Sequence, residues 1–283
     1  MFVLKTAVVG AGTMGGEIAH SIANADVPVV LKDLEQRFVD RGMEKARSLW
    51  DSRVEAGDLE RAEADRKLAL ITPTTSYEEL GDVDFVVEAT PERIGLKREV
   101  FAELDEVTPG HAILASNTSS LSITEMGLAT VRPELVVGFH FFYPASVMRL
   151  IEVIEGDDTA PETVQAAINF AQAIRKTPIR CAEAPGFVVN RILNSSVAEL
   201  WRYQEETGLE PEQLDRIVGD SDAAPIGPFI LCDILGLDTV LHVADYLEQS
   251  YGERFYVHGR MRELVAAGDL GVKTGKGFYE HGR

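Results

Sequence analysis

A glycine-rich turn near the amino terminus constrains the fold of this chain more than any other segment. The apolar run Thr6–Val9 leads directly into the hexapeptide GAGTMG, and residues 16–25 then carry apolar side chains at helical spacing. Gly10 permits a tight turn, Gly12 lets the backbone approach a pyrophosphate, and Gly15 allows close packing of helix on strand. The pattern predicts the first strand, turn and helix of a dinucleotide-binding domain.

An aspartate stands where such a domain binds a ribose. The next apolar run, Val27–Leu31, is followed by Asp33, which lies 18 residues beyond the last glycine of the turn. Its carboxylate would accept hydrogen bonds from the adenosine ribose hydroxyls and repel a 2′-phosphate, so we expect NAD rather than NADP. The alternative is a glycine-rich turn with a surface aspartate.

Strands and helices alternate through the rest of the first half, as a parallel sheet requires. We expect charged helices over 34–69 with a break at Gly57, and two further helices over 94–107 and 161–175. The expected strands are 69–72, 83–87, 113–115, 136–140, 150–154 and 177–181. Ligands of such sheets bind at the carboxyl ends of the strands, where this pattern places Glu92, Asn117, Ser119 and His140.

The second half lacks strand alternation. The dipeptide Pro185-Gly186 marks a break, after which we expect helices over 187–206, 211–218, 230–250 and 259–267. The predicted fold class is therefore α/β, with a Rossmann-type doubly wound sheet domain over 1–183. An all-helical domain for substrate binding and dimerisation is expected over 184–283.

His140 and Glu152 are the candidate acid–base pair. His140 ends the run Val-Val-Gly-Phe-His, and Glu152 interrupts the apolar run Leu-Ile-Glu-Val-Ile, where we expect its carboxylate to be buried. A buried ionised carboxylate is costly unless a partner compensates it, and an imidazole is a natural partner. The carboxylate would fix the histidine tautomer and favour the imidazolium formed when the base takes a proton. A core histidine beside a structural acid is the alternative.

The strongly acidic composition limits which molecules the protein can bind and suggests the ionic strength at which it works. The formal net charge is −19, with acidic residues spread along the chain, which argues against nucleic-acid or anionic-membrane binding. We expect either a salt-adapted surface or an ordinary acidic cytoplasmic enzyme. No apolar run approaches the roughly 18 residues that span a bilayer. Cys181 and Cys232 lack metal-ligand spacing, so no metal is expected.

Several motifs together resemble the short-chain L-3-hydroxyacyl-CoA dehydrogenases over essentially the whole chain. They are GAGTMG at 10–15, SNTSSL at 116–121, HFFYPASVMRLIEV at 140–153, PGFVVNRI at 185–192, the PIGPF and GLD pattern within 225–238, and KTGKGFY at 273–279. The resemblance implies an NAD-dependent oxidoreductase of fatty-acid β-oxidation or butanoate metabolism. It would act on an acyl-CoA thioester, such as 3-hydroxybutyryl-CoA, and be a cytoplasmic homodimer.

The same resemblance implies roles for individual residues. His140 resembles the general base that takes the 3-hydroxyl proton, and Glu152 the carboxylate that orients it. Ser119 and Asn190 match positions that hydrogen-bond the substrate oxygen and the histidine. The positions matching cofactor contacts near the nicotinamide and its ribose are Glu92, Lys97 and Asn117.

Two features leave the substrate open. The family usually has asparagine where this chain has Tyr143, which changes the hydrogen bonding and shape of the pocket. Lys45, Arg47 and Arg53 are candidates for coenzyme A contacts, with solvated helix surface as their alternative. A dehydrogenase of a free hydroxy acid, of the gulonate or carnitine kind, is therefore an alternative function. A non-catalytic NAD-binding protein is another, although Ser119, His140, Glu152 and Asn190 together argue against it.

Overall fold

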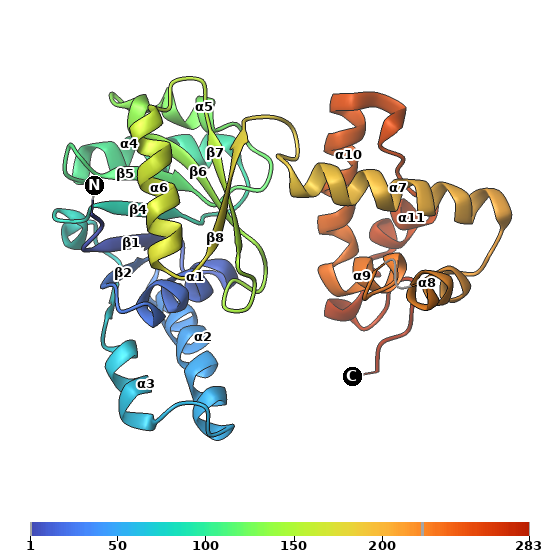
Figure 1. Ribbon diagram of the computed structural model, residues 1–283, viewed down its shortest axis with the longest axis horizontal. Helices are drawn as coiled ribbons and strands as arrows, with labels where there is room; N and C mark the ends of the chain where they lie inside the picture. Colours follow the sequence, from blue (N-terminus) through green and yellow to red (C-terminus); the bar gives the residue numbers. More distant parts are fainter. Residues whose placement is uncertain (1, 222–223, 283) are drawn as a thin grey trace. The chain divides into compact units, whose positions relative to one another are not determined.

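The computed structural model describes residues 2–221 and 224–282. The chain divides into two compact units, one ending at Glu183 and the next beginning at Ala184 (Figure 1). The first unit contains the sheet and its covering helices, and the second is helical. This is the predicted fold class, a Rossmann-type domain followed by an all-helical domain.

The first unit is built on an eight-stranded sheet in the order β3-β2-β1-β4-β5-β6-β7-β8. Neighbouring strands run parallel, except that β7 is antiparallel to β6. The strand order reverses between β1 and β4, which is the position where open α/β sheets bind ligands. The strands are β1 (Thr6–Val9), β2 (Val29–Lys32), β3 (Ile71–Thr74), β4 (Phe85–Glu88), β5 (Ile113–Ser116), β6 (Val136–Phe141), β7 (Leu150–Glu155) and β8 (Thr177–Ala182).

Helices cover this sheet. Its central strands consist largely of apolar residues, so both of their faces must be shielded from water. Every residue of β1, β4 and β5 is buried, as expected for parallel strands between two helical layers. Aromatic rings fill the core, with Phe85 5.2 Å from Phe139 and 4.7 Å from Phe170 between ring centroids. The helices are α1 (Thr13–Asn24), α2 (Gln36–Glu55), α3 (Arg61–Leu68), α4 (Ile94–Val107), α5 (Ile123–Gly127) and α6 (Pro161–Ala173), with short turns η1 (Glu78–Leu80) and η2 (Pro133–Leu135).

The second unit packs its helices around a separate core that contains Trp201, Phe229 and Met261. Its helices are α7 (Val189–Thr207), α8 (Pro211–Asp220), α9 (Pro228–Leu235), α10 (Leu237–Tyr251) and α11 (Gly259–Ala267), with turns η3 (Gly252–Arg254) and η4 (Val272–Thr274). The helix predicted over 230–250 is wrong, because Gly236 adopts φ +93° and separates α9 from α10. A left-handed residue cannot continue a right-handed helix.

A buried aspartate explains the carboxyl-terminal motif KTGKGFY. Asp233 is fully buried and accepts hydrogen bonds from the backbone N–H groups of Phe278 and Tyr279 at 2.9 and 3.0 Å. A Cβ at Gly277 would lie 2.3 Å from Asp233 Oδ1, so only glycine fits there. The motif therefore fastens the end of the chain to α9.

Smaller differences concern the ends of elements. The helix predicted over 161–175 ends at Ala173, because Arg175 adopts φ +62°. Strands β2, β3 and β4 each begin two residues later than predicted. The short helix α5 was not predicted; Ser122 caps it by accepting a hydrogen bond from Glu125 N at 3.0 Å.

Candidate active site

The glycine-rich turn joins β1 to α1 and leaves one side open. A Cβ at Gly10 would meet Ala89 O at 2.6 Å, and one at Gly15 would meet Gly10 O at 1.7 Å, so both glycines allow close backbone packing. A Cβ at Gly12 would have no neighbour within 4 Å. Gly12 is also the N-cap of α1, which has neither a side-chain cap nor an acid in its first turn. The first N–H groups of α1 therefore face an open position that suits a pyrophosphate.

Asp33 is held beside this turn. Its Oδ2 accepts a hydrogen bond from Ala11 N at 2.6 Å, and its Oδ1 accepts one from Leu34 N at 2.6 Å. These bonds fix the carboxylate at the end of β2, next to the turn. The turn and Asp33 together fit a dinucleotide whose adenosine ribose lies near β2.

Glu92 organises the end of β5. Its Oε1 accepts hydrogen bonds from Thr118 Oγ1 at 2.5 Å and from Ser119 N at 3.0 Å, and Ser119 Oγ lies 3.4 Å away. Burial raises the pKa of Glu92, but the Lys97 ammonium and the hydrogen bonds from Thr118 and Ser119 outweigh burial, so the pKa lies below its ordinary value. An ionised carboxylate therefore positions the segment that carries Ser119. The sequence did not single out Thr118.

Lys97 makes a buried ion pair with Glu88, which the sequence analysis missed. Nζ lies 2.8 and 3.0 Å from the two oxygens of Glu88 and donates to Thr90 O at 3.1 Å. Its distance to Glu92 is 3.4 Å. Lys97 thus orders the loop that carries Glu92. Direct contact of Lys97 with a cofactor stays a prediction. The sequence could have indicated that Glu88 is buried and paired. Its carboxylate directly follows the apolar residues Phe85–Val87, a pattern similar to that at Glu152.

His140 and Glu152 occupy opposed positions on the antiparallel strands β6 and β7. His140 Nδ1 lies 2.8 Å from Glu152 Oε2, and Glu152 is fully buried while His140 is 7% exposed. The neighbouring amide of Asn117 accepts a hydrogen bond from Phe141 N at 2.9 Å, which joins the end of β5 to the end of β6. A histidine with an acid on Nδ1 can accept a proton on its other nitrogen.

Two further sequence-predicted residues belong to other elements than β6 and β7. Tyr143 is 55% exposed in the loop between β6 and β7, three residues after His140, and its peptide bond to Pro144 is cis. Asn190 belongs to the second unit, where it is the second residue of α7 and its carbonyl accepts a hydrogen bond from Asn194 Nδ2 at 2.9 Å.

Both halves of the chain match models of one enzyme family. Residues 5–184 match the 3-hydroxyacyl-CoA dehydrogenase NAD-binding domain, and residues 186–281 match the 3-hydroxyacyl-CoA dehydrogenase C-terminal domain. The chain belongs to the 3-hydroxyacyl-CoA dehydrogenase family. Its cofactor is NAD, in agreement with the glycine-rich turn and Asp33.

Full-length relatives carry related names. A Clostridioides difficile 3-hydroxybutyryl-CoA dehydrogenase is 37% identical over 281 residues, which cover 99% of this chain and 100% of the relative. The fatty acid oxidation complex subunit alpha of Idiomarina loihiensis is 39% identical over 99% of this chain and 39% of that longer protein. The crystal structure of (S)-3-hydroxybutyryl-CoA dehydrogenase from Ralstonia eutropha has a TM-score of 0.95 at 37% identity, with all of both chains covered.

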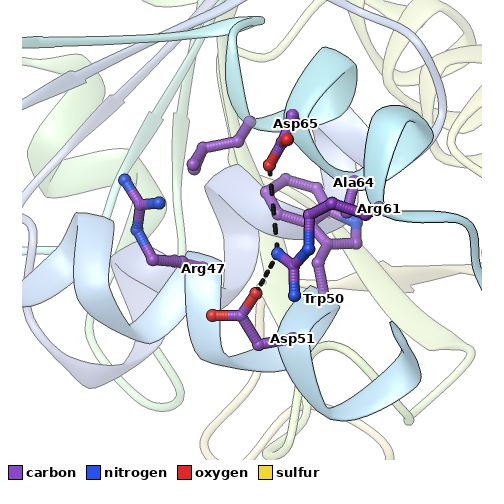
Figure 2. A pocket seen from close by; sticks show the side chains of 7 residues that line it. Arg47, Trp50, Asp51, Arg61, Ala64 and Asp65 are labelled. Atoms are coloured by element: carbon purple, nitrogen blue, oxygen red, sulfur yellow. Dashed lines mark hydrogen bonds and ion pairs between the residues drawn. The ribbon is translucent and has the colours of Figure 1, made fainter. Parts of the chain in front are cut away.

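The basic residues expected to contact coenzyme A in this 3-hydroxyacyl-CoA dehydrogenase all lie on α2. Lys45 Nζ lies 3.0 Å from the buried Glu17 Oε1, and Arg53 reaches Asn24 Oδ1 at 3.5 Å. Arg47 borders a small pocket between α2 and α3, where it stands apart from the ion pairs that Arg61 makes with Asp51 and Asp65 (Figure 2). Contact of these three residues with coenzyme A stays a prediction.

Within residues 2–221 and 224–282, no cluster of three or more histidine, cysteine, aspartate or glutamate side chains is placed to hold a metal ion. Within the same residues, no helix has the length and apolar character needed to cross a membrane.

Proposed function

We propose that this protein catalyses the reversible NAD-dependent oxidation of (S)-3-hydroxyacyl-CoA, such as 3-hydroxybutyryl-CoA, to 3-oxoacyl-CoA. The observation that carries the proposal is the buried pair of His140 and Glu152, 2.8 Å apart at the carboxyl end of β6. A secondary alcohol needs such a base to release its proton. The names of relatives that match nearly the whole of this chain support both the thioester substrate and a place in fatty-acid or butanoate metabolism.

The proposed chemistry divides between the cofactor and the protein. Bound NAD supplies the hydride acceptor. Glu152 holds the Nδ1 proton of His140, so Nε2 is the nitrogen that takes the 3-hydroxyl proton, and the buried carboxylate stabilises the imidazolium that forms. In the reverse direction the imidazolium returns this proton to the 3-oxo oxygen. Ser119 would donate a hydrogen bond to that oxygen, since Glu92 fixes its backbone at the adjoining strand end.

Further residues complete the proposed site. Asn190 would hydrogen-bond the substrate or His140 from the second unit, and Asn117 would contact the nicotinamide ribose beside β6. We assign the pyrophosphate to Gly10, Gly12 and Gly15, because the open side of the turn and the uncapped α1 suit an anion. The residues assigned to the rest of the cofactor are Asp33, Glu92 and Lys97, and those assigned to the thioester are Tyr143, Lys45, Arg47 and Arg53.

The protein is proposed to act as a cytoplasmic homodimer without nucleic-acid or membrane partners. The net charge of −19 supports the exclusion of anionic partners. The second unit supports dimerisation, because large apolar side chains on three of its helices are exposed, namely Ile192, Ile217 and Ile234.

The test is NADH oxidation with acetoacetyl-CoA, compared with free acetoacetate, in the parent protein and in His140→Ala. We expect turnover of the thioester alone and a loss of about 10²–10⁴-fold in kcat for the variant. Turnover of the free acid instead would identify a hydroxy-acid dehydrogenase. NADH binding with no turnover of either compound would contradict the proposal.

Tyr143 needs a separate comparison, because its exposed phenol follows His140 by three residues. We expect Tyr143→Asn to change the KM for acetoacetyl-CoA more than the affinity for NADH. Tyr143→Phe separates the hydroxyl from the bulk of the ring. Unchanged kinetics in both variants would remove Tyr143 from the substrate site.

A further inference from the structure

A second polar pocket lies in the first unit, between the carboxyl-terminal half of α1, the loop joining β6 to β7, and the turn joining α6 to β8. Its volume is about 120 Å³, roughly four times the share of one water molecule in the liquid. Its polar lining consists of His20, Ser21, Asn24, Ser146, Arg149, Arg175 and Lys176. We propose that this pocket binds a phosphate-type oxyanion.

Positive charge gathers here in a chain whose net charge is −19. Arg149, Arg175 and Lys176 line the pocket itself. Burial lowers the pKa of Lys176 and the charge of Arg149 lowers it further, while Glu17 acts in the opposite direction. The Glu17 carboxylate is already engaged by Lys45 at 3.0 Å and by Ser146 N at 3.2 Å. Arg149 and Arg175 are exposed, and the half-buried Lys176 donates hydrogen bonds from Nζ to Ala145 O and, at 2.9 Å, to Met148 O. The three positive charges together favour an anion at this opening.

His20 provides the second, independent observation. It is 5% exposed, and neither ring nitrogen has a hydrogen-bond partner among the described residues. Burial, followed by the charges of Arg53, Lys176, Lys67 and Lys45, lowers the pKa of His20 to about 3. The ring is therefore neutral at pH 7 and retains one N–H donor, which is costly to bury unsatisfied. An oxyanion in the pocket would accept this hydrogen bond.

The turn that supplies two of the cations carries backbone strain. Arg175 adopts φ +62°, in the left-handed region that favours glycine after a helix. Hydrogen bonds from Arg175 N to Gln172 O and from Lys176 N to Ala171 O, both 2.9 Å, fix this conformation. Arginine thus occupies a position where glycine would be less strained, and this arginine lines the pocket. Strain of this kind is commonly found at ligand sites.

Two sources of the anion share this chemistry: free phosphate, and a phosphate group of the coenzyme A substrate. Only the second source rests on the proposed function.

The direct test is titration of the full-length protein with inorganic phosphate at low ionic strength, monitored by calorimetry and by the ¹⁵N resonances of His20. We expect saturable binding, a shift of the His20 resonances, and about tenfold weaker binding in Arg175→Gly. Glycine suits the positive φ, so this variant should fold at least as well as the parent protein. Arg180→Gln is the matched control, because Arg180 pairs with Glu155 outside the pocket.

Equal phosphate affinity in Arg175→Gly, Arg180→Gln and the parent protein, or no change at His20, would overturn the proposal. These measurements need no turnover, so they stand apart from the proposed function. The KM ratio of acetoacetyl-CoA to its 3′-dephospho analogue then identifies the source. If the ratio becomes 1 in Arg175→Gly, the pocket binds the 3′-phosphate of the substrate. If the ratio in Arg175→Gly equals that of the parent protein while phosphate binding is weaker, the pocket binds free phosphate.

Discussion

Glu152 lies opposite His140 in the antiparallel ladder between β6 and β7, and its Oε2 is 2.8 Å from the imidazole Nδ1. Opposed residues on antiparallel strands are held close by the backbone itself. The imidazole orientation is therefore set by the strand register as well as by the hydrogen bond.

The Glu152→Gln variant tests whether this carboxylate acts through the histidine. We expect kcat for acetoacetyl-CoA reduction to fall by about 10²-fold, because a neutral amide stabilises the imidazolium less and no longer fixes the Nδ1 proton. The ¹⁵N resonances of His140 should show a larger fraction of the other tautomer. Glu155→Gln changes a half-buried glutamate at the end of the same strand, which pairs with Arg180, and should leave both readouts near the parent values. An unaltered tautomer balance in Glu152→Gln would argue against a positioning role.

The two glycines Gly12 and Gly15 should separate cofactor binding from folding. Gly12→Ala adds a methyl group with no neighbour within 4 Å, so the melting temperature should change little while NADH affinity falls. Gly15→Ala places its methyl group 1.7 Å from Gly10 O, so both stability and affinity should fall. Thermal unfolding and NADH fluorescence titration measure the two effects. Parent-like NADH affinity in Gly12→Ala would mean that the pyrophosphate lies elsewhere.

The stability contributed by Glu92 should depend on pH. Its pKa in the folded chain lies below the ordinary value of 4.5, so its contribution is fully present above about pH 4.5 and is lost as the pH falls through the folded-state pKa. Glu92→Gln should therefore be less stable than the parent protein at pH 7, and the gap should narrow at lower pH. Urea unfolding at several pH values measures this gap, with the exposed Glu99→Gln as control. A gap that widens on acidification would contradict the assigned direction.

Salt should assist binding of the anionic thioester. The net charge of −19 repels coenzyme A phosphates, and raising the ionic strength from about 0.1 to 1 M shortens the screening length from about 10 to 3 Å. We expect the KM for acetoacetyl-CoA to fall and activity to rise over this range. A short N-acetylcysteamine thioester lacks phosphates, so its KM should change less. A flat or declining profile for acetoacetyl-CoA would remove the screening argument.

Local patterns were sufficient to predict the strand, turn and helix that carry the expected cofactor residues. The turn of Gly10, Gly12 and Gly15 and the position of Asp33 depend on neighbours close in sequence, and the structure has the expected strand, turn and helix there. The helix break at Gly236 was missed because one glycine destabilises a helix by only about 1 kcal/mol relative to alanine. The glycine alone therefore did not distinguish one long helix from two shorter ones.

Long-range pairing explains what sequence reasoning left out. The antiparallel direction of β7 brings Glu152 opposite His140, and strand register is set by tertiary packing rather than by the residues of one strand. The pairing of Lys97 with Glu88 similarly needs the first turn of α4 to lie beside the end of β4. The sequence paired Glu152 with His140 without indicating the strand register that holds them together. It pointed to Lys97 without indicating Glu88 as its partner.

The proposed base His140 and the proposed acid Glu152 both belong to the first unit, on adjacent strands of one sheet. A chimera that replaced everything after Glu183 with another helical domain would therefore inherit the proton-transfer pair intact. Substrate preference could then diversify through the second half of the gene while the chemical step was conserved in the first. Recombination near this boundary offers a route to new hydroxyacyl dehydrogenases that need not assemble a catalytic histidine again.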